Sequence, residues 1–255
     1  MEKKIAFLGS KPIGYRCLEF LIDNQISLNC KVVAIFSKET TSFGNDLSIK
    51  KLAEENKIFY GTSLDELISS DHEIDFIISV QYHLILKPAH IKKAKILAVN
   101  LHMAPLPEYR GCNQFSFAIY NDAKNFGTTL HQLEAGIDNG KIIAERRFPI
   151  EKNILVKELY DKTFDESIIL FKENIENIIN EKFTLKPQEE MIPERGMHLY
   201  FRKDIDKLKQ IDLGTDAKEI AKKVRATAMP GYEPPYTIIE GEKIYLIPEK
   251  TYKFF

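Results

Sequence analysis

The sequence predicts an α/β fold with a doubly wound, mostly parallel sheet. Apolar runs of strand length alternate with helical patterns along most of the chain, which is typical of a sheet between two layers of helices. Two of these runs, 75–80 and 95–101, show no alternation with polar residues, so both of their faces should be covered. With 255 residues, 44% of them hydrophobic, the chain is long enough to bury a large core.

The first elements follow from the spacing of the apolar residues. The run KIAFLG (4–9) predicts a strand. The segment 13–22 predicts a helix because its apolar residues fall on one helical face: Ile13, Cys17, Leu18 and Leu21. The next strand is expected over 31–36, and the next helix over 46–57.

The second half of the large domain continues this alternation. The segment AVNLHMAPLPEYRGCNQFSFAI (98–119) begins as a buried strand, crosses a proline-containing loop and ends as a helix. Two further strands are expected over 126–133 and 141–150. A long helix over about 155–181 follows them.

The pattern changes after Pro187, where the residues become polar and the periods are broken. A helix is predicted over about 216–227, and YTIIEGEKIYLI (236–247) predicts a hairpin that turns at Glu240 and Gly241. The chain therefore divides into a large domain and a small helix-plus-hairpin C-terminal subdomain, residues 1–188 and 189–255.

The charge balance and the cysteines exclude several classes of protein. There are 36 basic and 37 acidic residues, and this net charge of −1 argues against a nucleic-acid partner. Three scattered cysteines without a CxxC pair predict neither a disulfide framework nor a metal site. Since the N-terminus lacks a signal peptide and no apolar run reaches about 18 residues, we expect a soluble cytoplasmic protein without a membrane partner.

Two common cofactor signatures are also missing. The first turn has Gly9 and Gly14 but not GxGxxG, and the second strand ends at Ser37 rather than at an acid, which argues against a nicotinamide cofactor. A helix N-terminus at this turn could still hold phosphate.

His131 is expected to be a strand residue whose hydrogen bonds are satisfied within the sheet, rather than a ligand. The other histidines show no metal-ligand spacing and are expected to be solvated or locally hydrogen bonded: His72, His83, His90 and His198.

Asn100 and His102 lie where a central strand of the predicted sheet ends. Open α/β sheets bind their ligands at the carboxyl ends of strands, and side chains two residues apart point to the same side. An amide donor and a titratable imidazole would thus converge on one spot. The pair alone leaves a structural role open, in which Asn100 caps the strand end and His102 packs under the proline-rich loop.

A third residue, Asp138, lies between two glycines in the segment HQLEAGIDNGKII (131–143). This loop joins two predicted strands, so the carboxylate can reach back to the rim of the sheet. Asn-x-His, a loop with Tyr-Arg-Gly and then Gly-Ile-Asp-x-Gly together resemble the folate-dependent formyltransferase family. The resemblance extends over about residues 1–185 and includes the first-strand turn and HLILKP (83–88).

The resemblance implies an enzyme that moves a formyl group from 10-formyltetrahydrofolate to a primary amine. Asn100 would then donate to the oxygen on which negative charge builds, a contact worth about 3–4 kcal/mol. His102 would accept the proton or, when protonated, act as a second donor, and Asp138 would orient it. The family binds its pterin largely through main-chain groups, which here fall at Leu84, Ile85, Leu86, Glu134, Ala135 and Asp138.

The tail makes the chain most similar to the small formyltransferases that act on nucleotide-linked deoxyamino sugars. That similarity implies a role in surface polysaccharide synthesis of the O-antigen type. Arg202 and Lys203 would face a diphosphate, and the alternative for them is a solvated basic pair. The residues assigned to the nucleotide-linked aminosugar are Ser10, Lys11, Tyr109, Gln114, Arg202 and Lys203.

Other acceptors and a non-catalytic role stay open. Methionyl-tRNA formyltransferases are longer and have a barrel domain with a basic surface, whereas glycinamide ribonucleotide formyltransferases are shorter and usually stop near the long helix. A binding protein on the same scaffold would keep the fold without the reaction. The small sugar enzymes tend to be dimers, and the tail here is too short to make its own core, so a homodimer is expected.

Overall fold

The central sheet has seven strands and confirms the predicted fold class. The computed structural model describes residues 1–38 and 47–254. The strand order is β3-β2-β1-β4-β5-β7-β8. Neighbours are parallel from β3 to β5, whereas β7 runs antiparallel to both β5 and β8. The strands span Lys3–Gly9 (β1), Cys30–Phe36 (β2), Phe59–Gly61 (β3), Ile74–Val80 (β4), Ala94–His102 (β5), Asn125–Gln132 (β7) and Ile142–Pro149 (β8).

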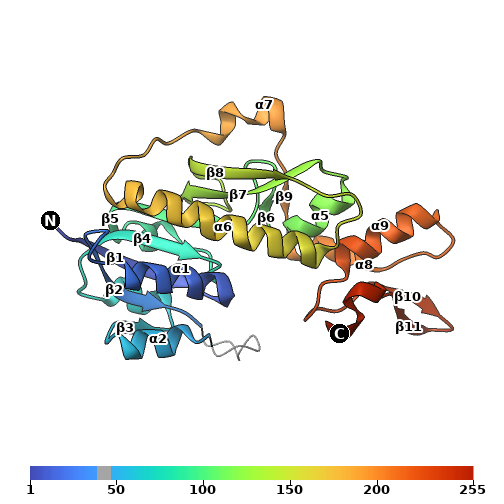
Figure 1. Cartoon of the computed structure of the whole chain (residues 1–255), viewed down its shortest axis with the longest axis horizontal. Coiled ribbons are helices and arrows are strands. Elements are labelled where there is room, and N and C mark those ends of the chain that lie inside the picture. The colour runs from blue at the N-terminus through green and yellow to red at the C-terminus, as the bar shows by residue number, and fades with distance from the viewer. Residues whose placement is uncertain (39–46, 255) are drawn as a thin grey trace.

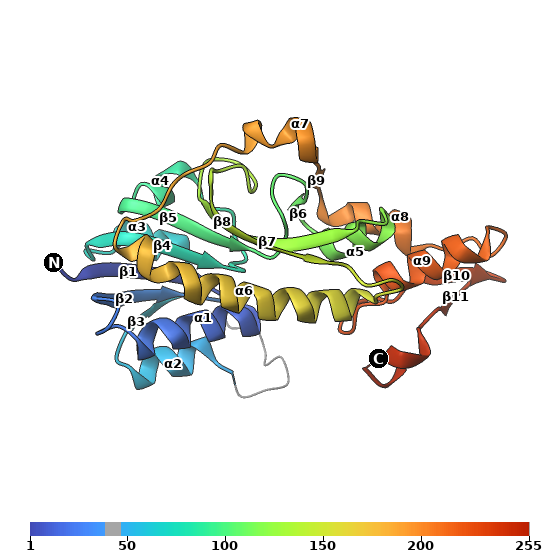
Figure 2. The ribbon, with the colours of Figure 1, turned by 45° about the horizontal axis from the view of Figure 1, so that its top comes forward.

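Helices cover both faces of this sheet (Figure 1, Figure 2). On one face lie α1 (Lys11–Asp23), α2 (Ile49–Glu55) and the long α6 (Val156–Ile179). On the other lie α3 (Leu64–Ser69) and α4 (Pro88–Ile91). Successive strand residues therefore point alternately into two apolar layers, which explains the absence of polar alternation in the sequence.

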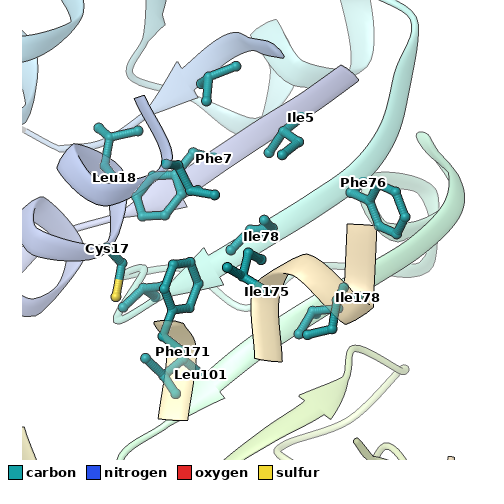
Figure 3. Close-up of a cluster of buried hydrophobic side chains, with 14 of the residues drawn as sticks. Ile5, Phe7, Cys17, Leu18, Phe76, Ile78, Leu101, Phe171, Ile175 and Ile178 are labelled. Atoms are coloured by element: carbon teal, nitrogen blue, oxygen red, sulfur yellow. The ribbon is translucent and has the colours of Figure 1, made fainter. Parts of the chain in front are cut away.

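The larger of the two cores lies between the sheet, α1 and α6. Phe7 and Ile78 from adjacent strands share it with Phe171 and Ile175 from α6 (Figure 3). The apolar face that the sequence predicts for α1 is completely buried: Ile13, Cys17, Leu18 and Leu21.

Several short elements are not predicted from the sequence, among them β3, α3 and α4. β3 has three residues, too few to show a period. The signal that could have found α3 is its capping box, in which the Ser63 hydroxyl and the Glu66 carboxylate each bond the other's main-chain N–H. The helix predicted over 46–57 is α2, and its first predicted residue lies outside the described residues.

The tail follows the β8 edge and then extends to one end of the molecule (Figure 1). The predicted helix and hairpin are both present, and the hairpin turns at Glu240 and Gly241 with φ values of +49° and +85°. Positive φ at both positions is what a tight two-residue turn requires. The position of the domain boundary stays a prediction. The tail comprises η1 (Gln188–Glu190), α7 (Ile192–Arg195), β9 (Leu199–Tyr200), η2 (Arg202–Ile205), α8 (Asp206–Lys209), α9 (Ala217–Thr227), β10 (Tyr236–Ile239), β11 (Glu242–Tyr245) and η3 (Glu249–Phe254).

The parallel topology brings the carboxyl ends of the central strands to one edge of the sheet. β1 and β4 are neighbours although the chain forms β2 and β3 between them. Their connections leave in opposite directions, and ligands of open α/β sheets bind at such a point. Ser10 and Lys11 follow β1, Gln81 follows β4, and Asn100 and His102 end β5.

Candidate active site

Asn100 and His102 project from the end of β5 on the same side of the strand. The antiparallel register with β7 pairs Asn100 with His131 and His102 with Thr129. Paired residues project from one face of a sheet, so His131 lies beside Asn100. The rings of His102 and His131 lie 6.3 Å apart, centroid to centroid, at an interplanar angle of 87°. The sheet thus brings one amide and two imidazoles together.

His102 has one ring nitrogen available for proton transfer. Its Nε2 lies 2.7 Å from the main-chain oxygen of Tyr109. A carbonyl oxygen can only accept a hydrogen bond, so Nε2 carries the hydrogen in the neutral ring. The lone pair is then on Nδ1, which faces Asp138.

His131 holds the Asn100 amide in one orientation. Its Nδ1 lies 2.9 Å from the main-chain oxygen of Gln132 and therefore donates to it. Its Nε2 accepts from Asn100 Nδ2 at 3.1 Å. Among the described residues no acceptor takes the second N–H of Asn100, which can donate to a bound molecule. The sequence predicted a satisfied sheet histidine, and these contacts confirm it. Sequence reasoning missed its place in the site, because the register between β5 and β7 decides it.

Asp138 reaches both histidines from the loop between β7 and β8. Its Oδ2 lies 3.6 Å from His102 Nδ1, and its Oδ1 lies 3.6 Å from His131 Nε2. Oδ2 also accepts a hydrogen bond from the Gly111 N–H at 2.9 Å. Burial acts to raise the pKa of Asp138, but the positive charges that His102 and His131 carry when protonated, together with the Gly111 N–H, outweigh burial and hold that pKa well below its ordinary value. Asp138 is therefore a fixed anion near neutral pH.

Two glycines allow the loop to bring Asp138 back to the sheet. Gly136 has a φ of +124°, which residues with a Cβ rarely adopt. At Gly140 a Cβ would lie 1.9 Å from the main-chain oxygen of Gln132. The backbone conformation of this loop thus requires both glycines of the Gly-Ile-Asp-x-Gly pattern.

A second group of polar residues lies at this edge of the sheet, after β1 and β4. The Ser10 hydroxyl donates to the main-chain oxygen of Gln81, and Lys11 Nζ donates to Gln81 Oε1 at 3.0 Å. Burial, and then the charge of Arg202, lower the pKa of Lys11. Arg202 comes from the tail, where Asn113 Nδ2 donates to its main-chain oxygen at 3.1 Å. Two neighbouring cations, half-buried Lys11 and exposed Arg202, favour an anionic ligand beside the ends of β1 and β4.

The family model described as "Formyl transferase" matches residues 3–175. The match covers more than half of the chain and contains Asn100, His102 and Asp138. The chain belongs to the formyl transferase family. The family expected from the sequence motifs is therefore confirmed.

This formyl transferase is similar to curated relatives of two kinds. It is 28% identical over 236 residues to the bifunctional polymyxin resistance protein ArnA of Wigglesworthia glossinidia brevipalpis, a match that covers 89% of this chain and 35% of that protein. The chain thus spans about a third of that relative's length. It is also 28% identical over 255 residues to the methionyl-tRNA formyltransferase of Lactobacillus delbrueckii subsp. bulgaricus, a match that covers 94% and 76%, respectively.

Solved structures of sugar enzymes share the fold over nearly the whole chain. An N-formyltransferase from Helicobacter canadensis, in complex with folinic acid and dTDP-3-aminofucose, has a TM-score of 0.75 and 27% identity, and the match covers 95% of this chain and 86% of that one. A sugar 3N-formyl transferase, in the presence of dTDP and 5-N-formyl-THF, has a TM-score of 0.74 and 28% identity over 96% and 85%. A 4-N formyltransferase from Francisella tularensis has a TM-score of 0.79 at 23% identity, which shows the fold alone.

The formyl transferase has an apolar loop after β4, where the sequence predicts a pterin site. Leu84 and Ile85 are 45% and 65% exposed, whereas Leu86 is buried. Within the described part of the chain, the main-chain groups of these three residues bond to no other main chain. Leu86 shares a cluster with Leu133, which immediately precedes the predicted contacts at 134–135. Both predicted stretches, 84–86 and 134–135, therefore border the same apolar cluster.

Three predicted substrate residues have other surroundings, and their substrate contacts stay predictions. The Tyr109 ring packs against Phe126 and Tyr200, and burial raises the pKa of Tyr109 to about 12. The main-chain oxygen of Tyr109, not its side chain, contacts the site. Gln114 is buried at the start of α5 (Gln114–Tyr120), and Lys203 is exposed beside Arg202.

Residues 1–38 and 47–254 contain no metal-binding cluster and no membrane-spanning helix. No three His, Cys, Asp or Glu side chains in these ranges are grouped so as to hold a metal ion. The helices there are too short or too polar to cross a bilayer. Cys17 and Cys30 are buried free thiols, and burial raises the pKa of Cys30 to about 11.

Proposed function

We propose that this formyl transferase moves a formyl group from 10-formyltetrahydrofolate to the amino group of a nucleotide-linked deoxyamino sugar. The observation that carries the proposal is the cluster of Asn100, His102 and Asp138, with the cations of Lys11 and Arg202 at the same edge of the sheet. Two similar structures hold a folate together with dTDP or a dTDP-linked aminosugar, which supports both ligands. Such a product fits surface polysaccharide synthesis of the O-antigen type.

The chain's own residues provide a donor, a base and a fixed charge. When bound, 10-formyltetrahydrofolate supplies the formyl group. The second N–H of Asn100 would donate to the formyl oxygen, on which negative charge builds. His102 would accept the proton that the attacking amine loses, at Nδ1 because Nε2–H is bonded to Tyr109. It would return this proton to the folate nitrogen when the bond between that nitrogen and the formyl carbon breaks. Asp138 stabilises the resulting imidazolium across 3.6 Å.

The loop after β4 suits a flat heterocyclic ring. Exposed Leu84 and Ile85 offer an apolar surface, and the main-chain groups of residues 84–86 offer donors and acceptors beside it. Glu134 and Ala135 would contact the ring through their main chain from the other side. Recognition by main-chain groups explains why the sequence shows no charged cofactor motif there.

The two cations at this edge of the sheet and the charge balance favour a nucleotide sugar over tRNA. Lys11 and Arg202 match a diphosphate, since charged donors bind phosphate oxygens strongly. Methionyl-tRNA formyl transfer is the second candidate, because that curated relative aligns with 94% of this chain. A chain with 36 basic and 37 acidic residues has no excess positive charge with which to bind a polyanion.

A formyl-transfer assay decides among these functions. The acceptors are nucleotide-linked 3-amino and 4-amino deoxysugars, charged initiator tRNA and glycinamide ribonucleotide, each with 10-formyltetrahydrofolate. We expect turnover of at least one amino sugar and no salt-dependent binding of tRNA at physiological ionic strength. Formylation of tRNA or glycinamide ribonucleotide at a matching rate would overturn the sugar assignment. Folate binding without turnover of any acceptor would indicate a non-catalytic binding protein.

Removal of the tail cations should weaken binding of the nucleotide sugar and spare turnover. Arg202→Ala deletes a contact made equally in the ground and transition states, and such uniform binding appears in KM. One charge-assisted hydrogen bond is worth about 1.5–3 kcal/mol, so KM should rise roughly tenfold to a hundredfold at nearly constant kcat. Lys203→Ala should show the same signature. Lys207→Ala removes an exposed cation from α8 as the control, and an unchanged KM in both test variants would exclude the tail from the substrate site.

The C-terminal hairpin should form the contact between two copies of this chain. Ile238, Ile239, Ile244 and Tyr245 are 46–48% exposed, on both faces of a two-stranded ribbon. So small a hairpin is marginal in water unless its apolar residues are covered. We expect a homodimer by light scattering at micromolar concentration.

A charge on the hairpin tests this dimer. Ile239→Glu should shift the mass to that of a monomer, because it places a carboxylate in the contact. Ile26→Glu is the matched control, since Ile26 is an exposed isoleucine of the large domain. A monomeric wild-type protein, or an unchanged dimer in Ile239→Glu, would refute the hairpin contact.

A further inference from the structure

Gln188 is a buried amide that the proposed reaction does not use. It lies in η1, just after the bridge between Lys186 and Ile142 returns the chain to β8. Its exposed fraction is 0%. Buried polar groups are stable only when they are paired, so the partners of this amide indicate its role.

All four hydrogen-bonding positions of the Gln188 amide are used. Its Oε1 accepts from Arg110 Nε at 3.0 Å and from Arg110 Nη2 at 2.7 Å. Its Nε2 donates to the main-chain oxygens of Asp138 at 2.9 Å and Gly140 at 2.7 Å. A neutral amide supplies two acceptor and two donor positions at once. One side chain therefore joins the Arg110 segment to the loop that carries Asp138.

Both ends of this junction act on the Asp138 carboxylate. Asp138 has a φ of +49°, a left-handed conformation that a residue with a Cβ keeps only where its surroundings impose it. The bond from Gln188 to its main-chain oxygen is such a constraint. Arg110 immediately precedes Gly111, whose N–H donates to Asp138 Oδ2. Gln188 thus restrains the backbone of Asp138 and also the donor that holds its carboxylate.

We propose that Gln188 is a positioning residue that holds the Asp138 carboxylate at its 3.6 Å distance from His102 Nδ1. Gln188 touches no reacting atom and acts through Asp138. It lies beyond the end of the family match at residue 175, so a segment outside that match holds the catalytic loop. The inference rests on the proposed function for the role of Asp138, but the position of the carboxylate is measurable without substrate.

Amide hydrogen exchange at Gly111 reports that position. The Gly111 N–H donates to the Asp138 carboxylate, whereas the N–H groups on either side of it donate to main-chain oxygens at 198 and 200 and serve as internal controls. Gln188→Met keeps the length of the side chain and removes its donors. We expect it to speed exchange at Gly111 about tenfold, towards the rate in Asp138→Ala, and to change the two neighbours much less.

Steady-state kinetics gives a second readout. Gln188→Met should lower kcat about tenfold to a hundredfold at nearly constant KM. A misplaced carboxylate reduces the stabilisation of the transition state more than it reduces the binding of the substrate. In an Asp138→Ala background the same change should lower kcat by no more than about twofold, since no carboxylate remains to be positioned. Arg195→Met is the matched control. Arg195 lies on the same tail segment as Gln188 and pairs with Glu145 of β8, so its loss should lower Tm without lowering kcat.

Gln188→Glu separates positioning from folding. It keeps an acceptor for Arg110 but sets an oxygen against the two carbonyl oxygens that Gln188 now binds, so it should fold and show the same two signatures. Unchanged Gly111 exchange in a folded variant would overturn the inference. So would a double variant whose loss of kcat equals the product of the losses in Asp138→Ala and in the Gln188 variant. Faster Gly111 exchange without turnover of any amino sugar would overturn only the proposed function.

Discussion

Replacement of His102 by alanine should lower kcat by about 10²–10⁴-fold. The variant loses Nδ1, the ring nitrogen that accepts the proton of the attacking amine beside the Asp138 carboxylate. The loss should appear equally in kcat and kcat/KM, because the proton transfer occurs only in the transition state. Steady-state formylation of the best nucleotide sugar from the acceptor panel measures it.

Two further variants separate this chemistry from packing. His102→Gln retains an N–H that can donate to the Tyr109 oxygen, but it cannot take up a proton near neutral pH, so it should be as inactive as the alanine variant. His72→Ala removes an exposed histidine and should keep wild-type turnover. Wild-type-like activity in His102→Ala would exclude His102 as the base.

The losses of kcat from replacing His102 and from replacing Asp138 should not be independent. Asp138 stabilises the imidazolium only when His102 is present, so the double variant should cost far less than the product of the two single losses. Costs that multiply would show that the two residues act independently.

Replacement of Asn100 by alanine should lower kcat by about 10²–10³-fold. The free N–H of Asn100 is the donor for the oxygen on which charge builds, while its other N–H is held by His131. Asn100→Asp has the same shape but presents an acceptor and a negative charge to that oxygen, so it should be at least as inactive. The measurement is kcat for the same sugar acceptor, with KM followed in parallel.

An amide elsewhere in the chain provides the control. Asn174 donates within α6 to the Leu170 oxygen, and Asn174→Ala should leave kcat unchanged. If Asn100→Ala raised only KM, Asn100 would bind the ground state and the transition state equally, and its role as oxyanion donor would be wrong.

The long elements of the fold were predictable because the apolar residues within each one follow a recognisable spacing. β1, β2, β4 and β5 are apolar runs, and α1 and α6 show one apolar face each. Burial on two sides of a strand or one side of a helix fixes these residue types locally. The short β3 and α3 escaped prediction. Three to six residues are too few for a period, and tertiary contacts decide their conformation.

The sequence by itself determined the residues whose positions depend on one strand or one loop. Asn100 and His102 share a side because strand side chains alternate, and glycines bracket Asp138 because its loop must turn sharply. Only the tertiary structure placed His131 beside Asn100 and Gln188 behind Asp138. These contacts join residues 31 and 50 positions apart, and they depend on strand register and on the path of the tail, which no local pattern encodes.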